Sequence, residues 1–209
     1  MNFENVIFGN INDFDKSLLK EIIDYLNEKE INYFYLSGLN EDFGKEYIKN
    51  NNFDYFFNFN KIYHVDKSYL DTLSEIDLEI RNNNYKKSND YIDQYYKIYF
   101  LTKLKPNLNN EKTLFIGNDI WTDAYYISEY TLANVILFKS KITFNKEEFN
   151  KDLKTINCFE NISDFKKIIE EETEFNYSKL KSFAKSYLIS KTVGKLDLDL
   201  SKIYKKSDK

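Results

Sequence analysis

The chain lacks the residues that mark several common classes of protein. Its 209 residues include one cysteine, Cys158, which excludes an internal disulfide and fits a reducing compartment. The only histidine, His64, has no second His or Cys nearby, so a zinc site is disfavoured and a packed, hydrogen-bonded side chain is expected. No Gly-x-Gly-x-x-Gly or Walker-type loop is present, which disfavours dinucleotide and ATP sites of those kinds. With no signal peptide and no apolar run as long as a membrane span, we expect a cytoplasmic protein without a membrane partner.

The chain also has no large excess of charge of either sign. The net charge is −4, with 30 basic residues scattered among 34 acidic ones and a dense basic run only in the tail at 202–209. This balance argues against nucleic acid as a partner. What the chain does have is aromatic residues: 18 Tyr and 18 Phe are ample for a core. The stripe Tyr95, Tyr96, Tyr99 and Phe100 has helical spacing, which predicts core packing or a homodimer contact.

Short apolar runs alternate with amphipathic patterns from the N-terminus onward. This alternation predicts an α/β fold with a doubly wound, mostly parallel, Rossmann-like sheet. We expect one α/β domain over 1–175, with a helical insertion at about 65–104 broken at 81–84, and a C-terminal helix and Lys-rich tail over 176–209. The expected strands are 6–8, 31–36, 55–57, 113–116, 135–138 and 155–159, and the expected helices include 15–29, 42–50, 163–172 and 177–190.

The most informative segment is 113–123. A buried strand is predicted to stop at Gly117, and two carboxylates follow it, Asp119 and Asp123. Carboxylates just past a strand of an open α/β sheet lie where such sheets bind ligands, and their hard oxygens suit Mg²⁺. The alternative is a solvated turn in which Asp119 or Thr122 caps the next helix.

Other polar side chains are predicted to gather at the same edge of the sheet. The first predicted strand ends at Gly9-Asn10-Ile11-Asn12-Asp13 and the second at Ser37-Gly38. The helix before the fourth strand should begin near Lys86 and Lys87, which places these lysines at the same edge. A hydroxyl, a lysine and a carboxylate pair form an arrangement suited to phosphate and Mg²⁺.

These features resemble the haloacid dehalogenase-like (HAD) hydrolase superfamily. Ser37, followed by Gly38, matches the family's second motif, and Gly117-Asn118-Asp119 with Asp123 matches the fourth. Lys87, with Lys86 as its alternative, stands for the lysine of the third. The resemblance covers about residues 4–172. It implies that Ser37, Gly38 and Lys87 bind phosphate, that Asp119 and Asp123 bind Mg²⁺, and that phosphomonoesters are hydrolysed.

This chain departs from the first motif of that family. Asp-x-Asp, whose first Asp is the nucleophile, reads Asn10-Ile11-Asn12 in this chain, and an amide is no nucleophile for phosphorus. Asp13 and Asp15 do match the Asp-x-Asp pattern, although a helix-capping role is the simpler explanation for these two residues. No cap domain follows the first or second strand. Two hypotheses remain: a Mg²⁺-dependent phosphohydrolase acting on a phosphorylated substrate, or an inactive relative that binds a phosphate ligand or a protein partner.

Overall fold

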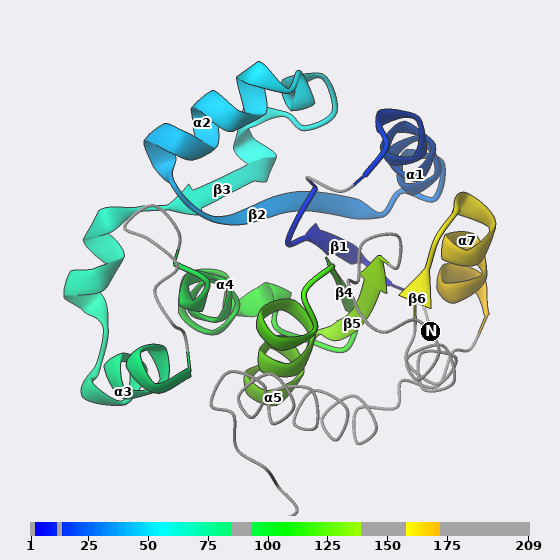
Figure 1. Cartoon of the computed structure of the whole chain (residues 1–209). Coiled ribbons are helices and arrows are strands. Elements are labelled where there is room, and N and C mark those ends of the chain that lie inside the picture. The colour runs from blue at the N-terminus through cyan, green and yellow to red at the C-terminus, as the bar shows by residue number, and fades with distance from the viewer. Residues whose placement is uncertain (1–2, 12–13, 85–92, 139–157, 172–209) are drawn as a thin grey trace, which may run out of the picture.

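The computed structural model describes residues 3–11, 14–84, 93–138 and 158–171. Its six strands form one sheet in the order β3-β2-β1-β4-β5-β6, and every neighbouring pair is parallel (Figure 1). The predicted α/β fold with a parallel sheet is thereby confirmed. The strands are β1 (Asn5–Phe8), β2 (Asn32–Asn40), β3 (Ile62–Val65), β4 (Thr113–Gly117), β5 (Asn134–Phe138) and β6 (Cys158–Phe159).

Helices cover both faces of the sheet because each presents one apolar side. One core lies under α1 (Lys16–Glu28), α2 (Glu41–Asn50) and α7 (Ile162–Glu170). The other lies under α4 (Tyr95–Tyr99), α5 (Tyr126–Tyr130) and part of α3 (Glu75–Asn84). The strands Asn5–Phe8 and Asn134–Phe138 are buried along their whole length and are apolar after their first residue, as expected for a sheet covered on both faces.

Short helical turns fill most of the remaining described connections. The 3₁₀ turns are η1 (Phe53–Tyr55), η2 (Phe59–Lys61), η3 (Lys67–Thr72) and η5 (Pro106–Leu108), while η4 (Phe100–Leu104) and η6 (Ile120–Tyr125) are wider π-type turns. Helices α1 and α2 follow β1 and β2 directly, without an intervening domain. Within the described residues, no helix is both long enough and apolar enough to cross a bilayer.

Three expectations about the elements are wrong. The run at 55–57 is not a strand: η1 occupies this region, with Phe53 and Phe57 both buried, and the third strand is β3. Strand β2 continues through Ser37 and Gly38 to Asn40 with an irregular register against β3. Residues 81–84 lie within α3 and do not interrupt it. The expected helix at 177–190 and the tail lie outside the described residues.

Candidate functional site at the carboxyl ends of β1, β2 and β4

The three strands that carry the predicted motifs lie side by side. Strand β1 is hydrogen-bonded to β2 on one side and to β4 on the other, and Phe8 is level with both Tyr35 and Ile116. The Gly9 backbone N–H donates to the Ile116 carbonyl at 2.8 Å. Continuing this register by two residues places Asn10, Ser37 and Asn118 at one level, so the predicted convergence is confirmed.

Asn10 stands at the centre of this edge and contacts the turn after β4. Its Nδ2 donates to Oδ1 of Asn118 at 3.0 Å, and the pair is partly buried. The position where the resemblance requires an attacking carboxylate is therefore occupied by an amide that bonds to another amide. An amide in this place supplies neither a negative charge nor a nucleophile.

Asp123 is the buried carboxylate of the site. Its side chain is 2% exposed, and Oδ1 accepts a hydrogen bond and ion pair from Nζ of Lys97. Oδ2 accepts from the backbone N–H groups of Asn118 and Asp119 at 3.2 and 3.3 Å. Both oxygens of Asp123 are thus engaged by donors of its own chain.

Gly117 makes room for Asp123. A Cβ at this glycine would lie 2.2 Å from the Asp123 Cβ, far inside van der Waals contact. The glycine that ends the predicted strand is therefore needed for the close approach of a carboxylate six residues later. This is a packing requirement that the sequence pattern alone does not show.

Sequence reasoning missed Lys97, which lies in α4 with its side chain only 3% exposed. The start of α4 faces the expected edge, because the Asp93 N–H donates to the Gly38 carbonyl at 2.6 Å. The direction predicted for this helix is confirmed, and Lys97 supplies the lysine at this edge. Lys86 and Lys87 lie outside the described residues. The available signal was a lysine inside an otherwise aromatic helical stripe.

Asp119 has a different environment from Asp123. It is exposed, and its Oδ1 accepts from the Thr122 backbone N–H at 2.6 Å and from the Thr122 hydroxyl at 3.1 Å. This is the capping geometry that the alternative interpretation of the segment predicted. The two carboxylates that sequence reasoning assigned jointly to Mg²⁺ therefore perform separate structural tasks.

The donor set at this edge does not fit a tightly held Mg²⁺. Magnesium in proteins is usually bound through one or two carboxylates, together with waters and substrate phosphates. Asp123 is neutralised by Lys97, and Asn10 and Asn118 carry no charge. Among the residues that the structure describes, no group of three or more His, Cys, Asp or Glu side chains is placed so that it could hold a metal ion.

Ser37 is buried at the same edge, and its hydroxyl accepts from the Leu39 backbone N–H at 3.0 Å. Tyr35, two residues before Ser37 in β2, is 2% exposed. Burial raises the pKa of the Tyr35 phenol, the nearby Ser37 hydroxyl lowers it to a smaller extent, and Tyr47 and Asp123 raise it. Tyr35 therefore remains a protonated donor at neutral pH.

The candidate nucleophiles other than Asn10 are only partly placed. Asp15 is exposed and caps α1, since its side chain accepts from the Ser17 N–H at 2.9 Å. The capping interpretation is thus confirmed for Asp15. Asn12 and Asp13 lie outside the described residues.

Comparisons with known proteins add little to this geometry. The chain matches no protein-family model and has no significant match among curated proteins. One similar solved structure is the "NMR structure of the core domain of, a putative phosphoglycolate phosphatase from Streptococcus pneumoniae TIGR4". It is 14% identical, with 82% of this chain and 98% of that chain covered and a TM-score of 0.42.

Proposed function

We propose that this protein is a HAD-like protein that binds a phosphate-type oxyanion at the ends of β1, β2 and β4 without hydrolysing it. The observation that carries the proposal is Asn10, a neutral amide hydrogen-bonded to Asn118 where hydrolysis needs an attacking carboxylate. Without such a carboxylate no phosphoenzyme forms on this residue. The retained groups are those that hold a ligand.

The charge balance of the site supports binding. Lys97 and Asp123 cancel each other, and Asn10 adds no negative charge that a phosphate dianion would have to overcome. Ser37 brings a hydroxyl group to the same edge. Hydroxyl and amide donors beside a buried lysine are suited to phosphate oxygens.

Mg²⁺-dependent phosphomonoester hydrolysis is the competing function, with Asp13 or Asp15 as its candidate nucleophile. The two functions differ in turnover. The full chain is assayed with p-nitrophenyl phosphate with and without Mg²⁺, and binding of inorganic phosphate is measured by calorimetry. We expect binding and no hydrolysis. Mg²⁺-dependent hydrolysis that is lost in Asp119→Ala would overturn the proposal.

Asn10→Asp tests the electrostatic part of the argument. The change is isosteric and adds one negative charge at the site, so phosphate should bind at least about tenfold more weakly without Mg²⁺. Asn60→Asp is the matched control, because it makes the same charge change at an exposed position before β3, at the other end of the strands. Equal weakening by both variants would show that only net charge matters and that the site is not the one proposed.

A further inference from the structure

The outer edge of β3 has no neighbouring strand within the described part of the chain. Strand β3 is the last in the sheet order, and its backbone hydrogen bonds join it to β2 and, through the Ile62 N–H and the Phe59 carbonyl, to the turn before it. Open strand edges pair with other chains unless charged side chains, proline or a covering segment prevents this. The strand Ile62–Val65 contains no acidic residue, no lysine and no proline. Its own sequence therefore leaves the edge open to pairing.

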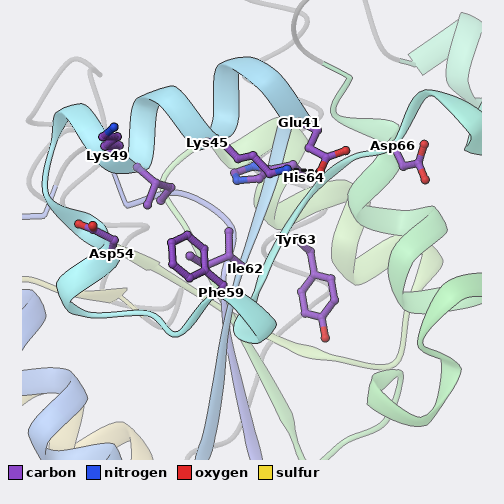
Figure 2. Close-up of a pocket in the computed structure, with 10 residues that line it drawn as sticks. Glu41, Lys45, Lys49, Asp54, Phe59, Ile62, Tyr63, His64 and Asp66 are labelled. Atoms are coloured by element: carbon purple, nitrogen blue, oxygen red, sulfur yellow. Dashed lines mark hydrogen bonds and ion pairs between the residues drawn. The ribbon is translucent and has the colours of Figure 1, made fainter.

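His64, in the middle of β3, adds no charge to this edge at neutral pH. Figure 2 shows its ring beneath α2. Both ring nitrogens are shielded from solvent and, among the residues that the structure describes, neither has a hydrogen-bond partner, so the expectation of a hydrogen-bonded histidine is wrong. A Cβ at Gly44 would lie 2.1 Å from His64 Nδ1, so the ring packs directly against the backbone of α2. Burial lowers the pKa of His64 to about 4, with Glu41 raising it and Lys45 lowering it to smaller extents.

A groove lies beside the open edge, between α2 and β3. Its volume is about 630 Å³, and we call it the α2–β3 groove. It is lined by Glu41, Lys45, Ile48, Lys49, Asp54, Phe59, Ile62, Tyr63, His64 and Asp66 (Figure 2). Ile48 is buried, whereas Phe59 is 76% exposed and lies beside Ile62 in Figure 2. One exposed apolar side chain is ordinary on a surface. Phe59, however, adjoins both a groove and an unpaired strand, so a partner that pairs with β3 would also cover its ring.

The two ends of this edge carry opposite charge. The end where β3 begins has two lysines and one carboxylate, Lys49, Lys61 and Asp54. The end where β3 finishes has two carboxylates and one lysine, Glu41, Asp66 and Lys45. Figure 2 shows Lys49 with Asp54 on one side of the groove and Glu41 with Asp66 on the other. A second copy laid antiparallel against β3 brings the basic end of each copy to the acidic end of the other, so the edge is complementary to itself.

The aromatic stripe at 95–100, which the sequence offered as a homodimer contact, does not form a competing surface. Tyr95, Tyr96 and Phe100 are buried in the core, as the alternative of core packing predicted. Tyr99 is half-buried, and its hydroxyl shares a hydrogen bond of 2.6 Å with that of Thr72. A self-contact is therefore better supported at the β3 edge than at this stripe.

We propose that two copies of this chain associate by pairing the outer edges of their β3 strands, antiparallel and about a two-fold axis. One sheet then continues through both copies, and each copy covers the α2–β3 groove and the Phe59 ring of the other. The Lys49 end of each groove faces the Glu41 end of the other groove, twice by symmetry. Because β3 has only four residues, few hydrogen bonds form, and we expect a dissociation constant on the order of 10–100 μM. The contact shares no residue with the proposed oxyanion site, so the two proposals can fail separately.

The test measures the mass of the full chain by sedimentation velocity in low-salt buffer, from about 1 μM to about 1 mM. We expect a monomer at the lowest concentration and a dimer at the highest. Phe59→Glu places a carboxylate in each covered groove and should weaken association at least about tenfold. Leu132→Glu is the matched control, because Leu132 is 64% exposed and lies between α5 and β5, away from β3 in the sheet order. The same change there should leave the dissociation constant unaltered.

An exchange of charges tests the antiparallel arrangement. Lys49→Glu alone sets a carboxylate against the other copy's Glu41, and Glu41→Lys alone sets two ammonium groups together, so each variant should associate at least about tenfold more weakly. An equal mixture of the two variants should recover the dimer, because both contacts of a mixed dimer join opposite charges. Both positions are exposed, and circular dichroism of each variant checks that it folds.

Three results would each overturn the inference. The first is a natural chain that stays monomeric at about 1 mM, which would leave the groove to a different partner. The second is Phe59→Glu associating as tightly as the natural chain, which would place any dimer contact elsewhere. The third is a mixture of Lys49→Glu and Glu41→Lys that associates no better than either variant alone.

Discussion

The ion pair between Lys97 and Asp123 gives the sharpest prediction about the site. Its side chains are 3% and 2% exposed, and they join α4 to the turn after β4. Lys97→Met keeps the length of the side chain and removes its charge, which leaves Asp123 as a buried carboxylate with only two backbone N–H donors. Removing one partner of a buried pair costs about 3–5 kcal/mol.

For the double variant we expect a loss of unfolding free energy that is not the sum of the two single losses. Asp123→Asn alone leaves the Lys97 ammonium buried and facing an amide, so it should also lose about 3–5 kcal/mol. In Lys97→Met with Asp123→Asn no charge is buried, and the new amide oxygen can still accept from the N–H groups of Asn118 and Asp119. We expect the double variant to be more stable than either single one, with a coupling energy of about 2 kcal/mol or more.

Urea unfolding followed by circular dichroism measures these differences, with equal m-values as the check on two-state behaviour. Lys20→Met is the matched control: Lys20 pairs with Asp24 at the surface, where the side chains are 54% and 60% exposed, and the midpoint should not move. Purely additive losses, or a loss below about 1 kcal/mol for Lys97→Met, would refute the assignment of a buried, mutually compensating pair.

Three further variants test individual contacts. Gly117→Ala should cost about 1–3 kcal/mol in urea unfolding, because its Cβ would lie 2.2 Å from that of Asp123. Asp15→Ala should cost about 1 kcal/mol through loss of the α1 cap, and any phosphatase activity should be unchanged if Asp15 is no nucleophile. His64, with a pKa lowered from 6.5 to about 4, binds a proton first in the unfolded chain. Stability should therefore fall between about pH 6.5 and pH 4, on the order of 2 kcal/mol after allowance for partial exposure, and His64→Phe should remove this dependence.

The sequence was sufficient for the strands that are buried on both faces. The apolar runs of β1, β4 and β5 are short and end at glycine or polar residues, and α1 has a clear helical period. Neighbouring parallel strands then bring their ends together, so Asn10, Ser37 and Asn118 could be placed at one edge without coordinates. This part of the site follows from periodicity and topology.

The third strand could not be located in the same way. The run at 55–57 is apolar enough for a buried strand, but Asn52 adopts φ 54° and starts a 3₁₀ turn that buries both Phe53 and Phe57. The actual strand β3 lies at the edge of the sheet and contains His64, so it is short and less apolar. Edge strands follow the apolar pattern weakly because they are only partly covered.

Lys97 was missed because its role depends on a partner 26 residues away. Taken alone, a lysine among tyrosines in a helix is most simply a side chain that reaches out to solvent. The burial of Lys97 is explained only once α4 is placed over the end of β4. There the turn after β4 holds Asp123 and two backbone donors. Helix placement of this kind is tertiary information that local patterns do not carry.

The ion pair between Lys97 and Asp123 also explains why an asparagine at position 10 is compatible with this edge of the sheet. A buried ammonium needs one compensating carboxylate, and Asp123 provides it, held in place by the N–H groups of Asn118 and Asp119. A second carboxylate at position 10 is therefore not required for the stability of the fold. With Asn10 bonded to Asn118, the buried charges already balance, and an added carboxylate there would call for an added cation. The chain can thus keep the adjacent ends of β1, β2 and β4 and their buried ion pair with an amide at position 10.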